Sequence, residues 1–194
     1  MSDSESIRSL IMRKDDLNRM RVVSEPAMGE LEKGDALLAV RRFSLTTNNI
    51  TYAAYGDPMG YWAFFPCADP EWGRMPVWGF ADVVASATDE LKVGERIYGF
   101  LPIADRLRVR PGRVRDGGFV DTMPHRGELP GGYNQYVRCQ SDALYTPDTE
   151  ALQAIYRPLY VTSFTLADYL RDNAFFGASR VILSSASSKT AYGT

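Results

Sequence analysis

The last part of the chain combines small residues, hydroxyls and one ammonium group in an order suited to phosphate binding. After the apolar run 181–183, these groups come from Ser185, Ser187, Ser188, Lys189 and Thr190. Small residues let a backbone approach a phosphate at the start of a helix, and hydroxyl and ammonium groups bind its oxygens. The stretch therefore predicts a strand, a turn and a helix start that bind a nucleotide.

The phosphate loop of NTPases shares some features with this stretch. It requires glycine directly before the lysine and again five residues earlier, where this chain has Ser188 and Leu183, so that class of site is excluded. A turn of small residues that only packs a helix against a sheet remains open. A dinucleotide site is favoured, because a β-rich region and a helix precede the turn.

A second group of reactive side chains, Asn49, Tyr52 and Tyr55, falls in a short helix predicted over 48–55, with Asn48 or Asn49 as its N-cap. A phenol with a pKa of about 10 stays protonated at neutral pH and can donate a proton. The amide of Asn49 can orient a carbonyl group. Half-buried packing of the rings is the alternative, because this chain is rich in tyrosine.

Three further groups of residues are better accounted for by structural roles. Arg106, Arg108 and Arg110 alternate with apolar residues, so a strand would place them on one face, where an anion could bind. A solvated face of an amphipathic strand is favoured. His125, the one histidine, stands in a loop sequence and is predicted to be structural or exposed. An aromatic group, predicted to be core or interface packing rather than an apolar pocket, comprises Trp62, Phe64, Phe65, Trp72 and Trp78.

Composition limits the class of protein. The 194 residues are 45% hydrophobic and carry a net charge of -2, so the chain can bury a core and has no basic field for nucleic acid or an anionic membrane. Two distant cysteines exclude a zinc knuckle and argue against a disulfide framework. No apolar run approaches the roughly 18 residues that span a bilayer. We therefore expect a cytoplasmic protein.

The order of elements indicates a β-rich domain followed by the start of an α/β domain. Gly, Pro, Asn and Asp separate short apolar runs, and the predicted strands are 7–12, 20–23, 36–43, 77–86, 96–101, 107–109, 133–139, 143–145 and 181–183. Apolar residues at spacings of three and four predict a helix over 148–173. Pro158 should divide this helix or start a second one, and Gly177 should follow its end.

Several motifs resemble the medium-chain dehydrogenase/reductase superfamily. They are GDALLAV at 34–40, KVGERIYGF at 92–100, GGYNQYV at 131–137 and SFTLA at 163–167. The segments at 48–53, 76–81 and 184–191 resemble an uncharacterised branch of that superfamily, whose function is unknown. The resemblance covers nearly the whole chain and is to the zinc-free quinone or enoyl reductase types.

The resemblance implies a mainly β fold. Residues 1–150 would form a GroES-like, partly open β-barrel, and 151–194 would be the truncated start of a Rossmann domain, with a helix and the first strand. It also implies NADP(H), bound by Thr165 and the 185–190 turn, and no metal. Zinc-dependent relatives carry ligands where this chain has Thr51 and 78–80, Trp-Gly-Phe, which cannot bind zinc.

The predicted function is the N-terminal part of a zinc-independent, NADP(H)-dependent oxidoreductase-like protein that reduces a polarised C=C or C=O bond of a small molecule. Asn49 would orient the acceptor and Tyr52 would supply the proton, and the fragment alone is expected to be inactive. The alternative is a noncatalytic GroES-like module that binds a ligand or partner. Strand 181–183 without neighbours would expose an apolar edge, so self-association as a homo-oligomer through 151–194 is expected.

Overall fold

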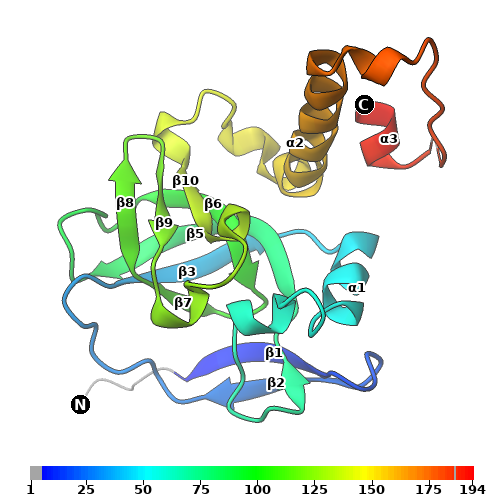
Figure 1. The fold of residues 1–194 in the computed structure, drawn as a ribbon. Helices are drawn as coiled ribbons and strands as arrows, with labels where there is room; N and C mark the ends of the chain where they lie inside the picture. The colour runs from blue at the N-terminus through cyan, green and yellow to red at the C-terminus, as the bar shows by residue number, and fades with distance from the viewer. Residues whose placement is uncertain (1–5, 186) are drawn as a thin grey trace.

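Seven antiparallel strands form the main sheet of the computed structural model, which describes residues 6–185 and 187–194. They pair in the order β7-β3-β5-β6-β10-β9-β8 (Figure 1). Their bounds are β3 (Ala36–Phe43), β5 (Pro76–Ser86), β6 (Arg96–Pro102), β7 (Arg106–Val109), β8 (Pro111–Arg115), β9 (Gly118–Asp121) and β10 (Gln135–Arg138). The central strands β3, β5 and β6 agree closely with the strands predicted from the sequence.

A smaller sheet lies below the main one in Figure 1, with the strand order β2-β1-β4. Its strands are β1 (Ile7–Arg13), β2 (Met20–Glu25) and β4 (Trp72–Gly73). A backbone hydrogen bond of 2.9 Å from Leu10 N to Ile103 O ties it to the segment that follows β6. The two sheets together form a partly open half-barrel, and the prediction of a mainly β fold is confirmed.

The core fills the space inside this half-barrel. Leu38, Val77 and Phe100 project from the main sheet and are fully buried, as the apolar alternation of their strands predicts. Phe64 joins them from a short 3-10 helix, η1 (Tyr61–Phe64). The other 3-10 helices are η2 (Pro124–Arg126), η3 (Gly131–Asn134), η4 (Cys139–Ser141), η5 (Pro147–Thr149) and η6 (Ala174–Gly177).

Between β7 and α2, two strands were missed and two sequence-based strand predictions are corrected. Strands β8 and β9 were not predicted, because arginine and glycine interrupt their apolar pattern. The predicted strand at 133–139 starts later, since residues 131–134 form η3. Residues 143–145 form a turn instead of a strand, in which the side chain and the carbonyl of Asp142 accept the N–H groups of Leu144 and Tyr145.

Helix α1 (Thr47–Ala54) begins slightly earlier than the asparagines suggested. Its N-cap is Thr46, and the Oδ1 atom of Asn49 accepts the Thr46 backbone N–H at 2.7 Å. Asn49 therefore stands at the third helical position and reaches back to the cap, as the polar residue of a capping box does. The prediction of Asn48 or Asn49 as N-cap was wrong for this reason.

Helix α2 (Glu150–Asp172) runs without a break through Pro158, so the predicted division at this proline was wrong. Proline has no N–H to bond the carbonyl four residues earlier, which here belongs to the buried Ala154. The Ser44 hydroxyl replaces that donor with a hydrogen bond of 2.8 Å to Ala154 O. The loop before α1 thus supplies the bond that proline removes, and the helix end falls at Asp172, before Gly177.

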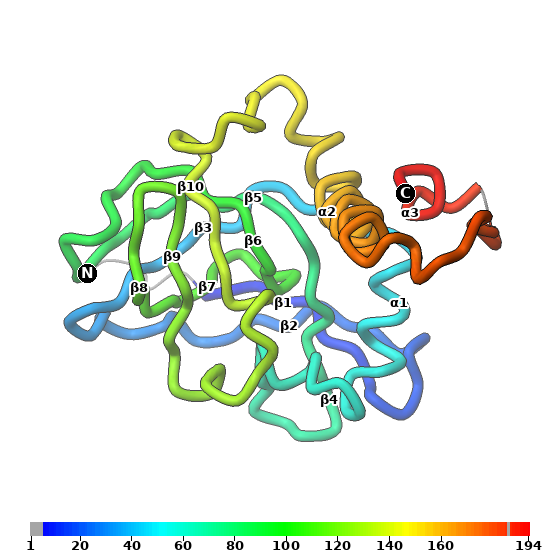
Figure 2. The backbone as a smooth tube through the Cα atoms, turned by 45° about the horizontal axis from the view of Figure 1, so that its top comes forward, coloured from blue at the N-terminus to red at the C-terminus, as the bar shows by residue number. Residues whose placement is uncertain are grey.

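The C-terminal segment packs on α2 and not on a sheet. The short helix α3 (Lys189–Gly193) lies on the side of α2 away from the barrel (Figure 1, Figure 2). The buried Ser163 hydroxyl is 2.7 Å from Thr190 O. The predicted strand at 181–183 is absent: Ile182 is 93% exposed, and no described strand pairs with this segment. A strand forms only where a neighbour supplies its hydrogen bonds.

Within the described ranges, none of the helices is both long and apolar enough to cross a membrane. Nor do His, Cys, Asp and Glu side chains gather there in a group that could bind a metal ion.

We predict that Ser44→Ala lowers the free energy of unfolding by about 1–2 kcal/mol, because it leaves the buried Ala154 carbonyl without a donor. Urea denaturation followed by circular dichroism measures this loss. Thr165→Ala is the matched control, since this exposed hydroxyl only bonds its own helix at Val161 O, and its effect should stay within about 0.5 kcal/mol. Equal losses in the two variants would contradict the role given to Ser44.

Candidate functional site

A cavity of about 390 Å³ lies between the half-barrel and helix α2. Its barrel side is lined mainly by aromatic residues: Tyr52, Trp78, Tyr98, Tyr133, Gln135 and Val137. Its helix side is lined by Arg157, Pro158, Val161 and Thr162. The volume and the mixture of aromatic walls with a few polar groups are typical of a small-molecule site.

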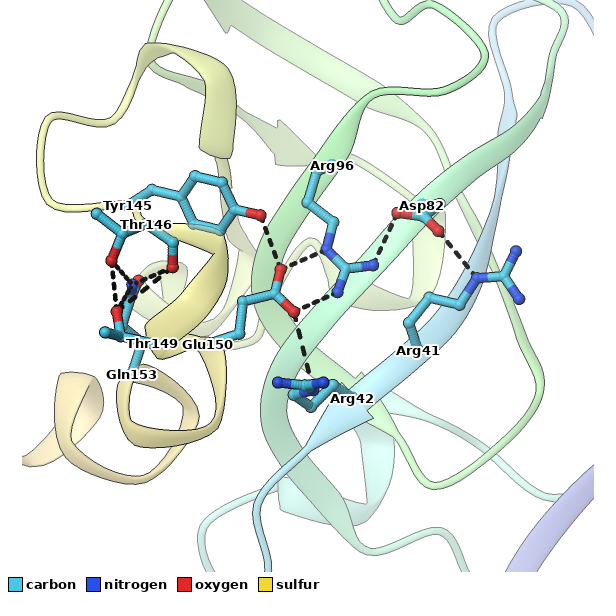
Figure 3. A network of polar contacts seen from close by, with 9 residues as sticks. All are labelled: Arg41, Arg42, Asp82, Arg96, Tyr145, Thr146, Thr149, Glu150 and Gln153. Carbon is cyan, nitrogen blue, oxygen red and sulfur yellow. Dashed lines mark hydrogen bonds and ion pairs between the residues drawn. The ribbon is translucent and has the colours of Figure 1, made fainter.

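Glu150 holds the first turn of α2, the helix that forms one wall of the cavity, against the sheet (Figure 3). Its carboxylate accepts two hydrogen bonds from Arg96, at 2.8 and 2.6 Å, and one from the Tyr145 hydroxyl at 2.8 Å. Arg42 lies 3.8 Å away, and Arg96 also donates to Asp82 at 2.8 Å. One buried acid thereby joins the helix to strands β3, β5 and β6.

The pKa of Glu150 follows from this environment. Burial acts to raise the pKa of the carboxyl group, but the hydrogen bonds from Arg96 and Tyr145 outweigh it, and the pKa is lowered from the usual 4.5. Burial and the hydrogen bond to Glu150 raise the pKa of Tyr145 to about 12. Glu150 is therefore ionised and Tyr145 protonated throughout the neutral range.

A second ion pair fixes the middle of the helix. Arg157 lies 2.5 Å from the Asp142 carboxylate, and its guanidinium carbon lies 4.6 Å from the centre of the Tyr98 ring. Tyr98 in turn stacks on Trp78, with ring centres 5.8 Å apart. Arg157 therefore closes one end of the cavity by contact with an aromatic ring and an acid.

Tyr52, predicted as the proton donor, projects from α1 into this cavity. Trp78 Nε1 donates a hydrogen bond of 3.2 Å to its hydroxyl oxygen. Burial raises the pKa of the phenol despite that bond, so Tyr52 is protonated at neutral pH. Its own proton is not used in any hydrogen bond among the described residues, which leaves it available to a ligand.

Two other tyrosines of the cavity were not singled out by sequence reasoning. Burial raises the pKa of both Tyr98 and Tyr133, and both remain hydrogen-bond donors. The Tyr133 hydroxyl is 3.1 Å from that of Tyr61, whereas the buried Tyr98 hydroxyl has no partner within the described part of the chain. The sequence does not mark these two tyrosines as site residues, because only the tertiary fold brings β6 and η3 beside α1.

Asn49 lies next to Tyr52 but is engaged with the backbone. Its side chain is buried, its Nδ2 donates to Pro76 O at 2.9 Å, and its Oδ1 accepts from Thr46 N. These bonds fix α1, and with it Tyr52, on strand β5. Its predicted contact with a substrate carbonyl stays a prediction.

The residues predicted to bind a cofactor lie apart from the cavity, since none of the six lines it. Thr165 donates to Val161 O within its own helix, and Ser188 caps α3 by accepting the Ala191 N–H at 3.1 Å. Ser185, Ser187 and Lys189 are exposed, and Thr190 O lies against Ser163. Their donor groups suit a phosphate, and the binding of a coenzyme by these residues stays a prediction.

The remaining candidates have structural partners. Arg108 and Arg110 each bond the buried Asp35 carboxylate at 2.6 Å, so the prediction of a solvated face was wrong for these two. The carboxylate of Asp35, directly before β3, binds both guanidinium groups and keeps them partly buried. His125 is exposed, with a ring nitrogen 3.3 Å from Phe64 O, as expected of a structural histidine.

The aromatic group predicted at 62–78 is divided among four places. Phe64 and Phe65 belong to the main core, and Trp62 packs with Met12 in a separate cluster. Trp72 lies beneath the Arg21 guanidinium, and Trp78 alone lines the cavity.

This chain was compared with protein families, with curated proteins and with solved structures. A family profile described as "Protein of unknown function (DUF2855)" matches residues 43–194. A search of curated proteins finds no match. Similar solved structures include a quinone oxidoreductase from Coxiella burnetii, with 11% identity, a TM-score of 0.38, and coverage of 66% of this chain and 40% of that one. Another is an oxidoreductase/dehydrogenase of unknown specificity involved in membrane biogenesis from Escherichia coli, with 16% identity, a TM-score of 0.42, and coverage of 84% and 47%. The chain thus matches less than half the length of these two proteins.

We predict that Glu150→Gln lowers the free energy of unfolding at pH 7 by about 2 kcal/mol, because it removes the charge that Arg96 binds. Because the pKa of Glu150 is lowered in the folded protein, its contribution to the free energy of unfolding is complete above the usual value of 4.5. That contribution is lost as the pH falls from 4.5 through the lowered pKa of the folded protein. The difference between the parent and the variant should therefore shrink below pH 4.5. Urea denaturation from pH 3 to pH 7 measures it, with the exposed Glu128→Gln as control. A difference independent of pH would exclude this account.

Proposed function

The chain belongs to the DUF2855 family of proteins of unknown function, and we propose that it forms the substrate-binding part of a zinc-independent, NADP(H)-linked oxidoreductase. Two kinds of observation support the proposal. One is the set of motifs that resemble medium-chain reductases, including GGYNQYV at 131–137. The other is the aromatic cavity, into which that same motif places Tyr133.

The observation that carries the proposal is the hydrogen bond from Trp78 Nε1 to the Tyr52 hydroxyl within the cavity. A bond received by the phenol oxygen stabilises the phenolate that remains after a proton is given away. It also directs the phenol's own proton away from Trp78. This arrangement supports Tyr52 as the general acid that protonates a bound molecule.

The proposed reaction is the reduction of a polarised C=C or C=O bond. The coenzyme, when bound, supplies the hydride. Tyr52 donates the proton that completes the reduction, and the aromatic walls hold the flat, conjugated part of the substrate and exclude water. Asn49 acts through α1, because its two backbone contacts set the position of Tyr52.

A noncatalytic binding module is the second candidate. The specific observation in its favour is that Thr165 and Ser188 use their hydroxyls within the chain, while 181–183 is not a strand. In that case the cavity would bind a small molecule without any coenzyme. The two candidates share the ligand site and differ in their response to NADPH.

We predict that a protein in which this chain is joined to a complete coenzyme-binding domain oxidises NADPH in the presence of trans-cinnamaldehyde, whereas the 194-residue chain alone does not. Tyr52→Phe should slow this reaction about 100-fold, as loss of a general acid does. Absorbance at the nicotinamide band measures the rate. Tyr55→Phe is the matched control on the same helix, since its side chain is exposed and outside the cavity.

The two candidates predict different results in this assay. Cinnamaldehyde binding without any NADPH oxidation or change in NADPH fluorescence would favour the noncatalytic module. Oxidation at an unchanged rate in Tyr52→Phe would refute the role of Tyr52.

A further inference from the structure

We propose that Tyr133 is a second hydrogen-bond donor to the substrate, so that Tyr52 and Tyr133 together bind one oxygen of a flat, conjugated carbonyl compound. This inference rests on the proposed function, and it adds a residue and a chemical class of ligand to it. Its first support is the direction of the hydrogen bond between two phenols.

The Tyr61 and Tyr133 hydroxyls are 3.1 Å apart, and either could donate. Tyr61 is only 5% exposed, and its hydroxyl has no other hydrogen-bond partner among the described residues. If Tyr133 donated, the proton of Tyr61 would be buried without an acceptor, which is costly. This cost favours donation from Tyr61 to Tyr133, and in that arrangement the proton of Tyr133 has no acceptor in the described part of the chain.

Tyr52 shows the same arrangement. Its oxygen accepts from Trp78, and its proton also has no acceptor among the described residues. The rings of Tyr52 and Tyr133 are neighbours, with centres 6.4 Å apart and planes at 85°, and both line the cavity. Two protonated phenols, each with its oxygen in a hydrogen bond with a neighbouring side chain, thus line one cavity.

The rest of the cavity wall also has more hydrogen-bond donors than acceptors among its side chains. Its described lining contains no carboxylate, includes the Arg157 guanidinium, and includes Tyr98, whose buried hydroxyl is also without a partner there. A wall with surplus donors selects a ligand rich in acceptors and disfavours amines. The aromatic faces of Trp78, Tyr52 and Tyr133 favour a flat, conjugated molecule.

A carbonyl oxygen has two lone pairs and can accept from both phenols at once. When hydride addition to a conjugated C=C bond turns the carbonyl into an enolate, negative charge gathers on this oxygen. Donors that are already in place stabilise that charge without rearrangement. The second phenol therefore contributes to binding and gains importance as the charge develops.

The test compares two probes of nearly equal shape. trans-Cinnamaldehyde carries the carbonyl oxygen, and trans-β-methylstyrene has a methyl group in its place. Equilibrium dialysis with the 194-residue chain gives the dissociation constants, and infrared spectroscopy gives the carbonyl stretching frequency of the bound aldehyde. We expect Tyr133→Phe to weaken binding of the aldehyde about fivefold, to leave the hydrocarbon unchanged, and to raise the carbonyl frequency.

Two variants complete the design. Tyr61→Phe removes the bond that orients Tyr133, so it should weaken aldehyde binding by a smaller factor and leave hydrocarbon binding unchanged. Tyr55→Phe should behave as the parent protein. Retained hydrocarbon binding shows that the cavity of a variant is intact.

The possible failures can be told apart. If Tyr133→Phe binds the aldehyde with the parent's affinity and carbonyl frequency while Tyr52→Phe weakens it, the role of Tyr133 is refuted and the proposed function stands. If Tyr133→Phe weakens both probes equally, the residue only packs, and the inference is again refuted. If neither probe binds the parent protein, the proposed function fails with it.

Discussion

The bond between the buried Glu150 carboxylate and Arg96 is the constraint on which the rest of the structure depends. A charge that is 6% exposed is stable only when its partners replace the water it has lost. Arg96, Tyr145 and Arg42 do so from three different elements, and each fixes the first turn of α2 from a different direction. Without this anchor the first turn of the helix would lose its ionic contacts with the sheet, and the wall that α2 gives the cavity would depend on the Ser44 hydrogen bond and the Arg157 ion pair.

The middle of α2 is held by a hydrogen bond that replaces one lost from the helix itself. Pro158 removes a backbone donor at the point where the helix faces α1, and the Ser44 hydroxyl takes its place. The proline ring then lines the cavity. The break in the helical ladder is thus compensated on the barrel side and presents an apolar surface on the ligand side. The ion pair of Arg157 with Asp142 fixes the preceding residue of the same turn.

Much of this fold could be predicted from local sequence. Strands β3, β5 and β6 follow from their apolar runs and turn residues, because burial of one face needs no knowledge of the partner. The continuity of α2 could not be predicted, since the compensating donor lies 110 residues away at Ser44. Tyr52 was found because its helix resembles a known motif. Tyr133 and Tyr98 were missed because nothing local distinguishes a tyrosine whose proton has no acceptor from one that packs.

The geometry also separates substrate binding from coenzyme binding. Every described residue that lines the cavity precedes Ser163, whereas the segment predicted to bind NADP(H) packs on the opposite side of α2 through Ser163 and α3. Apart from α2, which bonds Thr190 through Ser163, the elements that build the cavity make no described hydrogen bond with the 185–190 turn. A ligand can therefore be bound and oriented by this part of the chain whether or not that turn takes a coenzyme. Binding of a carbonyl compound thus tests the cavity alone, and NADPH oxidation tests its coupling to the second site.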